Sequence, residues 1–185
     1  MTRPFSIVAL LLLGFNAAAA SDATLLESIA MVESGQNRKA IGKAGERGMY
    51  QLKKASWDDA CALLESIAMV ESGQNRKAIG KAGERGMYQM GKDAWTDANA
   101  RLESQGHYHY QWSKWRNDTA QDMTAASHLR WIRANFVRVG KPDPTPEQIA
   151  VVWNLGWSAS VSRRFAPNDY AIRVGNLFRL SQRSK

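Results

Sequence analysis

The strongest constraint on the fold of this chain is an internal repeat. Residues 25–51 read LLESIAMVESGQNRKAIGKAGERGMYQ, and residues 63–89 repeat the whole stretch without a change, 38 residues further on. The triplet Leu-Glu-Ser occurs at 26–28, 64–66 and 102–104, with the same spacing each time. A unit of this length is too short to bury a core of its own, and two units are too few for a solenoid. We therefore interpret the repeat as a tandem duplication inside one domain.

The first 20 residues have the order of a secretory signal peptide. Arg3 supplies a positive charge, residues 5–15 are almost entirely apolar, and Ala18 and Ala20 form an A-x-A pattern. The apolar run is shorter than the roughly 20 residues that a membrane-spanning helix needs. We expect cleavage before Ser21 and an exported protein, periplasmic or secreted, with no stable membrane insertion. An uncleaved membrane anchor is the alternative.

The charge of the mature chain limits its partners. Cleavage after residue 20 removes only Arg3 of the 25 Lys and Arg and none of the 17 Asp and Glu, which leaves a net charge of +7. Such a charge favours an acidic polymer, a nucleic acid or a membrane surface as partner, and an exported chain meets the cell wall first. A general role in solubility explains the charge equally well. Cys61 is the only cysteine, so no intramolecular disulfide can form.

Apolar residues at helical spacing predict an all-α chain. The segment 106–117 is aromatic, polar and aperiodic, and we expect a loop there. No segment alternates convincingly as a strand, but a small two-stranded turn at residues 40–50, or in the copy of that segment, stays open. The expected helices cover residues 25–34, 63–72, 92–102, 118–137, 145–155 and a last segment from residue 168.

Three helix ends carry clear local signals. Thr145, Pro146 and Gln148 combine a cap, a first-turn proline and a capping-box partner,. Gly156 is suited to end the same helix. Asp118 is the expected N-terminal cap of the long helix at residues 118–137.

Glu71 is the candidate catalytic residue of the second copy. It lies in the last turn of the expected helix 63–72, where the negative end of the helix dipole opposes a carboxylate anion. Burial against apolar neighbours would also raise its pKa and hold its proton near neutral pH. A general acid that protonates a glycosidic oxygen needs this property. The alternative is an exposed glutamate at a frayed helix end.

The residues after Glu71 favour a catalytic acid over an exposed glutamate at a frayed helix end. The matching positions are Glu71, Ser72, Asn75, Ala78, Gly83, Gly86 and Gln89. In these residues and their spacing the chain resembles the soluble lytic transglycosylase and goose-type lysozyme families. Residues 153–156, Trp-Asn-Leu-Gly, look like the Tyr-Asn-Ala-Gly element of those families, and Tyr170 looks like the tyrosine of their late helix. The resemblance covers roughly residues 63–180.

The resemblance implies roles for individual residues. Glu71 would be the acid, Ser72 would help to orient it, and Tyr88 with Gln89 would line the sugar groove. Trp153, Asn154 and Tyr170 are the further expected substrate-binding residues. For Gln89 and Asn154, hydrogen bonding to the backbone competes evenly with direct contact to substrate.

The sequence departs from the family pattern at four positions. Gly80 stands where the families usually have Ser, and Glu84 where they usually have a small residue. Tyr88 replaces a common Met, and Trp153 a common Tyr. The substitutions preserve the loop and the aromatic surface but leave open how the substrate is bound.

The first copy repeats the motif with Glu33 in the place of Glu71. Only one copy can face the downstream helices. We favour Glu71, because the second copy runs directly into Trp95 and the rest of the domain. Glu33 is the alternative acid, and it would make the second copy an insertion, whose loop-closure cost grows slowly with length.

A second carboxylate would decide the type of reaction, since glycosidases usually employ a pair. Asp93 and Asp97 follow the motif at helical spacing, but a solvated surface explains them better. Aromatic residues between 108 and 115 could stack on sugars or be buried in part. His107 and His109 form an H-x-H pair, which without more ligands is weak evidence for a metal. We expect no metal and no cofactor.

Together these features predict an all-α, lysozyme-like single domain with a signal peptide at 1–20, a first copy of the duplicated segment at 21–62 and the catalytic domain at 63–185. By resemblance it is a peptidoglycan lytic transglycosylase that cuts the MurNAc-GlcNAc β-1,4 bond and forms 1,6-anhydro ends. The alternatives are a lysozyme-type hydrolase of the same bond and a non-catalytic peptidoglycan-binding module. We expect a monomer that binds glycan strands. A basic protein that binds nucleic acid or membranes is a further rival, but charge alone would not require the motif.

Overall fold

The described part of the chain folds into helices, and the longest connection between them is the loop of residues 73–91 that carries the motif. The computed structural model describes residues 54–183, and the expected signal peptide, the helix at 25–34 and the turn at 40–50 lie outside them. The helices are α2 (Lys54–Ser72), α3 (Lys92–Ser104), the 3₁₀ turn η2 (Trp112–Lys114), α4 (Asp118–Arg138), α5 (Pro146–Leu155), α6 (Trp157–Ser162) and α7 (Asp169–Arg183). No strand is present among residues 54–183. The all-α fold class predicted from the sequence is confirmed.

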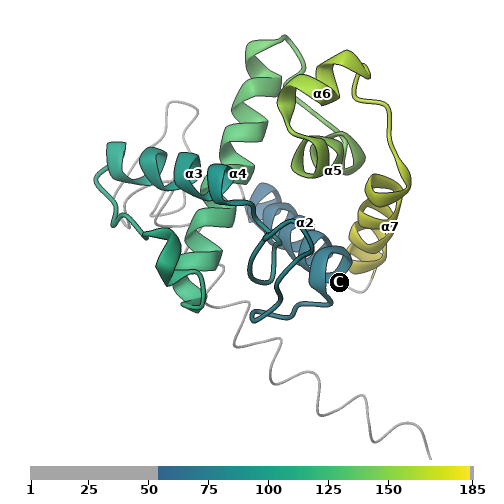
Figure 1. The fold of residues 1–185 in the computed structure, drawn as a ribbon. Helices are drawn as coiled ribbons and strands as arrows, with labels where there is room; N and C mark the ends of the chain where they lie inside the picture. The colour runs from purple at the N-terminus through teal and green to yellow at the C-terminus, as the bar shows by residue number, and fades with distance from the viewer. Residues whose placement is uncertain (1–53, 184–185) are drawn as a thin grey trace, which may run out of the picture.

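The packing of the described helices centres on α5, which contacts α4, α6 and α7. In Figure 1, α3 crosses α4 on one side of the molecule, and α5, α6 and α7 lie on the other side. The last helix returns to the first described one, because α7 packs against both α2 and α5. The contacts between α4 and α5 join the two sides.

Helix α2 extends at least nine residues before the start predicted from the repeat, from Leu63 back to Lys54, the first residue that the structure describes. The shift of 38 residues that relates the two copies places Lys54–Ser66 on Lys92–Ser104, the residues of α3. The last helix of one repeat unit therefore runs without a break into the first helix of the next. Gly73 ends it with a φ of 62°, and its amide donates to the Met69 carbonyl at 3.0 Å.

The core lies on one face of α2. Leu63, Leu64, Ile67 and Ala68 are at most 1% exposed, and their spacing places them along one stripe of the helix,. They join a single hydrophobic cluster with residues from the other long helices. Position 71 follows this stripe by one turn, so packing of the stripe fixes where the end of α2 points.

Local capping explains most of the helix boundaries. The Thr145 side chain accepts from the Gln148 amide at 3.3 Å, and the Gln148 side chain accepts from the Thr145 amide at 3.0 Å, as predicted. Asn117, not Asp118, caps α4, and its side chain accepts from the Ala120 amide at 2.8 Å. Because Asn117 is the cap, Asp118 lies in the first turn of α4, where its negative charge interacts favourably with the helix dipole,.

Helix α6 was missed by the sequence analysis, which ended the preceding helix at Gly156 and predicted no helix between that residue and residue 168. Gly156 adopts φ 78° and ψ 166°, and it is both the C-cap of α5 and the N-cap of α6. Because glycine adopts positive φ at little cost, the chain turns sharply there and starts a new helix at once. The six-residue length of α6 gave too short a periodic pattern to detect.

The loop between α2 and α3 contains a small turn that is held by two isolated β-bridges and not by strands. Isolated bridges pair Ile79 with Arg85 and Arg85 with Met90. This turn lies in the second copy, at the position that the sequence analysis left open. The expected loop at 106–117 contains the 3₁₀ turn η2. Across residues 54–183, none of the helices combines the length and the apolar character needed to cross a membrane.

Deletion of residues 25–62 should leave a folded protein with one cooperative melting transition, as expected of a small single domain. The reason is that, among residues 59–183, the deletion removes only Ala60 and Ala62 from the buried set. Differential scanning calorimetry measures this. A matched deletion of residues 25–53 keeps all of Lys54–Ser72. Its melting temperature should be at least as high as that of the longer deletion. Loss of the transition in the longer deletion alone would place residues 54–62 among the segments that the fold requires.

Candidate functional site

Glu71 lies in the last turn of α2, half-buried beside the loop and α7. Burial is the largest influence on its carboxyl group and raises the pKa. The Tyr170 hydroxyl and the Arg173 charge lower it, and the negative charge of Glu84 raises it. The net effect is a pKa above the ordinary value, which fits a carboxyl group that keeps its proton toward neutral pH.

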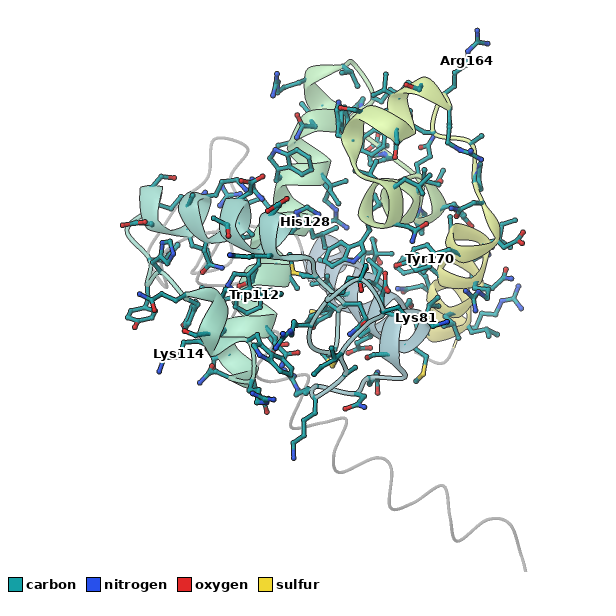
Figure 2. All side chains as sticks on the ribbon, in the orientation of Figure 1. Lys81, Trp112, Lys114, His128, Arg164 and Tyr170 are labelled. Carbon is teal, nitrogen blue, oxygen red and sulfur yellow. The ribbon has the colours of Figure 1, made fainter. Side chains whose placement is uncertain are left out.

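Tyr170 comes from the first turns of α7 and faces the acid. Figure 2 shows it on the inward side of this helix. Burial, followed by the negative charge of Glu71, raises the pKa of Tyr170 well above its ordinary value. The hydroxyl lies against the Glu71 carboxyl group, but the contact does not reach full hydrogen-bond geometry, and the hydroxyl has no other partner among the described residues. The structure thus brings two sequence-predicted residues together across α2 and α7.

Ser72 joins the end of α2 to the motif loop through hydrogen bonds. Its hydroxyl donates to the Met87 carbonyl at 2.7 Å and accepts from the Asn75 amide at 3.0 Å. Both partners are backbone groups of the motif loop. Any effect of Ser72 on the acid is therefore indirect, through the position of the helix end.

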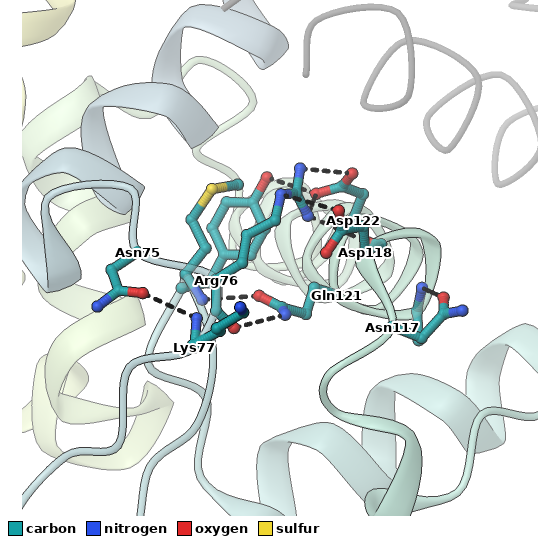
Figure 3. A network of polar contacts seen from close by, with 10 residues as sticks. Asn75, Arg76, Lys77, Asn117, Asp118, Gln121 and Asp122 are labelled. Atoms are coloured by element: carbon teal, nitrogen blue, oxygen red, sulfur yellow. Dashed lines mark hydrogen bonds and ion pairs between the residues drawn. The ribbon is translucent and has the colours of Figure 1, made fainter. Parts of the chain in front are cut away.

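A buried polar network ties the same loop to α4 (Figure 3). The Arg76 guanidinium binds the Asp122 carboxylate through two hydrogen bonds, at 3.1 and 3.0 Å. The Tyr88 hydroxyl donates to the same carboxylate at 3.1 Å. Burial raises the pKa of Asp122, while Arg76 and Tyr88 lower it. The side chain of Asp122 is 0% exposed, so these partners supply the hydrogen bonds that water would otherwise provide,.

Gln121 adds a second connection from α4 to the loop. Its side chain accepts from the Met87 amide at 2.7 Å and donates to the Arg76 carbonyl at 2.9 Å. Gly86 makes this approach possible, because a Cβ atom there would lie 2.5 Å from the Gln121 Oε1 atom. Gly86 also adopts a φ of 77°. This glycine of the motif is thus required by both the turn and the close contact.

Tyr88 is beneath the site rather than at its surface. We expected it to line a sugar groove, but its side chain is 2% exposed and its hydroxyl is used by Asp122. Gln89, the next residue, is half-buried with a φ of 45°, and its side-chain amide donates to the Gly86 carbonyl at 2.8 Å. Backbone bonding, one of the two readings open for Gln89, is therefore present.

Trp153 and Asn154 bring the end of α5 to this region. The Trp153 indole donates to the Tyr88 carbonyl at 3.4 Å, and the two rings pack with centroids 6.3 Å apart. Asn154 is exposed, and its side chain accepts from the Asn168 amide group at 3.1 Å. Asn168 in turn caps the start of α7 by accepting from the Ala171 amide. The end of α5 thus contacts both the motif loop and the helix that carries Tyr170.

His128 packs behind Trp153, with ring centroids 5.0 Å apart, and stacks on Trp131. Burial is the main reason that the pKa of His128 falls to about 3, and the charge of Arg101 lowers it further. The imidazole is therefore neutral at physiological pH. It supports the aromatic ring of Trp153 and supplies no charge to the site.

Other sequence candidates lie away from Glu71. Asp93 and Asp97 are exposed on α3. His109 pairs with Glu103 at 2.8 Å. Within residues 54–183, no three His, Cys, Asp or Glu side chains gather as metal ligands. In the aromatic segment, Trp115 is buried, Tyr110 and Trp112 pack against the core, and Tyr108 is 66% exposed.

Sequence reasoning missed four residues in and around the motif. They are Arg76 in the loop itself, Gln121 and Asp122 on α4, and Arg173 on α7. One signal was present: Gln121 and Asp122 interrupt the run of small and apolar residues on a helix whose buried face includes Ala120 and Met123. Polar residues on a buried face need partners. Their partners, however, are more than 30 residues away in sequence, so the pairing itself gave no local signal.

Glu33 and the rest of the first motif copy lie outside the described residues. The structure therefore describes the second copy alone. Its contacts with α4, α5 and α7 are those given above.

Replacement of Asp122 by Ala should lower the free energy of unfolding by about 3–5 kcal/mol, because it leaves the mostly buried Arg76 guanidinium without its partner,. The control is Asp118→Ala. Asp118 approaches Arg76 at 3.8 Å but its side chain is 62% exposed, and such surface pairs contribute about 0–1 kcal/mol. Urea denaturation followed by circular dichroism measures both. Similar losses in the two variants would contradict the assignment of the network to Asp122.

Comparisons with known proteins agree with the resemblance in the motif. The family model described as the transglycosylase SLT domain matches residues 15–62, about a quarter of the chain. No curated protein and no solved structure matches the chain. The matched segment includes residues 25–51, whose sequence is identical to that of the described loop and helix end at 63–89. Members of this family act on peptidoglycan, in the periplasm or outside the cell. Over this segment the chain is similar to the transglycosylase SLT domain, in agreement with the resemblance found in the motif.

Proposed function

We propose that this protein is a lytic transglycosylase that cuts the MurNAc-GlcNAc β-1,4 bond of peptidoglycan with Glu71 as its acid and base. The observation that carries the proposal is the position of Glu71. It ends the buried stripe of α2, is half-buried itself, and has a raised pKa for which burial is the main cause. The family match covers the first copy of the motif, whose sequence is identical, and it supports peptidoglycan as the substrate of this carboxyl group.

The reaction needs one group that both gives and takes a proton. Protonated Glu71 donates to the glycosidic oxygen as the bond between that oxygen and C1 of the muramyl residue breaks. The resulting carboxylate accepts the proton of the muramyl 6-hydroxyl as its oxygen bonds to C1. The product is a 1,6-anhydro ring, no water is consumed, and Glu71 is protonated again. General acid-base catalysis of this kind typically contributes about 10²–10⁴-fold to the rate.

The surroundings of Glu71 support this exchange of protons. Tyr170 and Arg173 both lower the pKa of the acid, and burial and Glu84 both raise it. The opposing influences leave the carboxyl group able to lose its proton to a leaving group and to recover it. A carboxyl group with burial alone would hold the proton more tightly.

Substrate contact is assigned to groups that remain accessible around the acid. Asn154 is exposed, and Gln89, Trp153 and Tyr170 are half-buried. Ser72 and Tyr88 act from below, by holding the loop to the end of α2 and to α4. The partner is a peptidoglycan glycan strand, and we propose that the mature protein acts on it as an exported monomer.

Two other functions use the same site. A lysozyme-type hydrolase would cleave the same bond with water. A non-catalytic peptidoglycan-binding module would retain the surface without turnover. A nucleic-acid-binding or membrane-binding protein would instead show an affinity that falls steeply with salt, and neither the raised pKa of Glu71 nor the motif is needed for it.

The choice between motif copies also belongs to the proposal. The second copy is supported by its contacts, because Arg76 and Tyr88 reach Asp122 and Glu71 lies against Tyr170. The family match at residues 15–62 covers the first copy, with Glu33. The two motif segments are identical, so the match does not discriminate between Glu71 and Glu33.

Digestion of purified peptidoglycan should release fragments with 1,6-anhydromuramic ends, because the proposed route uses the 6-hydroxyl in place of water. Mass spectrometry of the earliest products identifies the ends. Fragments that carry a reducing muramic end from their first appearance would show a hydrolase. Binding to peptidoglycan without any fragments would favour the binding module.

Substitution of Glu71 by Gln should abolish lysis, with a loss of about 10²–10⁴-fold in rate, while Glu33→Gln retains most of it. The side chains are nearly isosteric, so folding and binding to the wall should persist as the transferable proton is lost. Turbidity loss of cell-wall suspensions and a pull-down on insoluble peptidoglycan measure the two properties. The reverse pattern would assign the site to the first copy. Activity in the Glu33→Gln/Glu71→Gln double variant would end the mechanism.

A further inference from the structure

Arg101 and Trp131 form a cation–aromatic contact between α3 and α4. The Arg101 Cζ atom lies 5.2 Å from the centroid of the Trp131 ring. Arg101 belongs to the last turn of α3, and both side chains are half-buried. A guanidinium group that packs on an aromatic ring still offers its N–H groups to partners in its own plane. The contact with Trp131 therefore leaves the hydrogen bonds of Arg101 to be made with other groups.

Two of those N–H groups have no partner. The Nε and Nη2 atoms of Arg101 are shielded from solvent, and nothing in residues 54–183 accepts a hydrogen bond from either. Burial lowers the pKa of Arg101, and the charge of Asp97 on the same helix opposes that shift. Arg76 shows what a half-buried arginine requires, because its guanidinium binds the Asp122 carboxylate through two hydrogen bonds. Arg101 offers the same chemistry to a carboxylate that the described residues do not supply.

His128 places a third unpartnered atom beside the same ring. Its imidazole stacks on Trp131 with ring centroids 5.4 Å apart, and its Nδ1 atom is buried without a hydrogen-bond partner. Because buried polar atoms are nearly always hydrogen-bonded in folded proteins, such a group indicates a missing partner. Arg101 from α3 and His128 from α4 thus present three unpartnered polar atoms around one aromatic side chain.

A row of contacts joins this ring to the candidate site. His128 also packs on Trp153, with ring centroids 5.0 Å apart, and the Trp153 indole donates to the Tyr88 carbonyl of the motif loop at 3.4 Å. Figure 2 labels His128 where α4 passes between α3 and α5. Trp153 is half-buried and is one of the groups to which substrate contact is assigned above. The row therefore extends the site from Trp153 across α4 to α3.

We propose that Arg101, Trp131 and His128 form an accessory subsite that binds a carboxylate carried by the muramyl sugars of the glycan strand. The identity of the strand rests on the function proposed above. The subsite deepens that function, because it names a part of the substrate that is recognised apart from the bond that is cleaved.

A carboxylate fits the unpartnered edge of Arg101 better than a neutral sugar hydroxyl does. Nε and Nη2 lie on one edge of the guanidinium, and a carboxylate accepts from both in parallel. Because both atoms are shielded in this structure, the guanidinium has to turn toward the ligand. A cation–aromatic contact is weaker than a bidentate, charge-assisted pair, so this turn is favourable. Muramyl sugars carry such an anion, either as the lactyl carboxylate or as a carboxylate of the peptide attached to it.

Titration of the full chain with three probes tests the subsite. N-acetylmuramic acid presents the lactyl carboxylate, muramyl dipeptide presents a peptide carboxylate, and muramyl dipeptide with that carboxyl group converted to an amide presents none. NMR follows the ¹⁵N–¹H signal of the Arg101 Nε group, assigned with Arg101→Lys. The signal should shift with one or both carboxylate probes, which identifies the source of the anion, and not with the amide. No shift with either carboxylate, or an equal shift with the amide, would overturn the subsite.

Arg101→Lys tests the bidentate contact, because lysine keeps the charge but cannot form two parallel hydrogen bonds. Binding of the active probe should weaken by about 10-fold. The KM for fragment release from peptidoglycan should rise with kcat unchanged, as expected when an interaction away from the reacting bond is lost. Arg116→Lys is the matched control, since the Arg116 Cζ atom lies 4.4 Å from the Trp115 ring centroid but its side chain is exposed. It should change neither quantity, and equal losses in the two variants would show a general attraction for anions and contradict the subsite.

Probe binding does not depend on turnover, because the probes contain no bond between two sugars. If the Arg101 signal responds as described but the parent chain forms no fragments from peptidoglycan, the subsite stands and the proposed function fails. If the parent chain forms fragments and no carboxylate probe shifts the signal, the function stands and the subsite fails.

Discussion

The bidentate ion pair between Arg76 and Asp122 is the interaction on which the site depends. It joins the motif loop to the longest helix, and the Asp122 carboxylate is fully buried. A buried carboxylate is costly unless it is paired and hydrogen-bonded, so Arg76 and Tyr88 must both be in place when the loop packs on α4. The pair therefore fixes one arrangement of the loop. Through Ser72, which donates to the Met87 carbonyl in the same loop, that arrangement extends to the end of α2 and to Glu71.

This arrangement gives different roles to neighbouring residues of the motif. Tyr88 and Gln89, which the sequence suggested would both contact substrate, lie in different environments. Tyr88 points to the buried carboxylate and holds the loop from below, while Gln89, with positive φ, turns the chain back toward Gly86. The spacing of glycines thus serves the packing of Gln121 as much as the geometry of the turn. A motif of this kind combines structural support with chemistry.

Much of the fold could be predicted from local signals, and the failures have physical causes. The helix start at Thr145 was predicted correctly because its cap, proline and partner lie within four residues. The start of α2 was wrong because the joint of two repeat units lies inside a helix, where helical patterns from both units merge. The position of Glu71 at a helix end was evident, and its resemblance to a known motif was specific. The roles of Asp122 and Tyr88 depend on contacts across the fold, which spacing along the chain does not encode.

Because the sequence repeats the motif, two copies of the loop could compete for the same partners. The sequence contains the motif loop twice, but the partners that seat it, Gln121 and Asp122 on α4 and Tyr170 on α7, are each present once. Two identical loops cannot bind one buried carboxylate at the same time. Since their sequences are equal, the loops have equal contacts to offer, and connection to the chain must decide between them. The second copy leads into α3 through a short turn and needs no other segment to be displaced. The first copy could take its place only if the second left α4, with the Arg76–Asp122 pair broken.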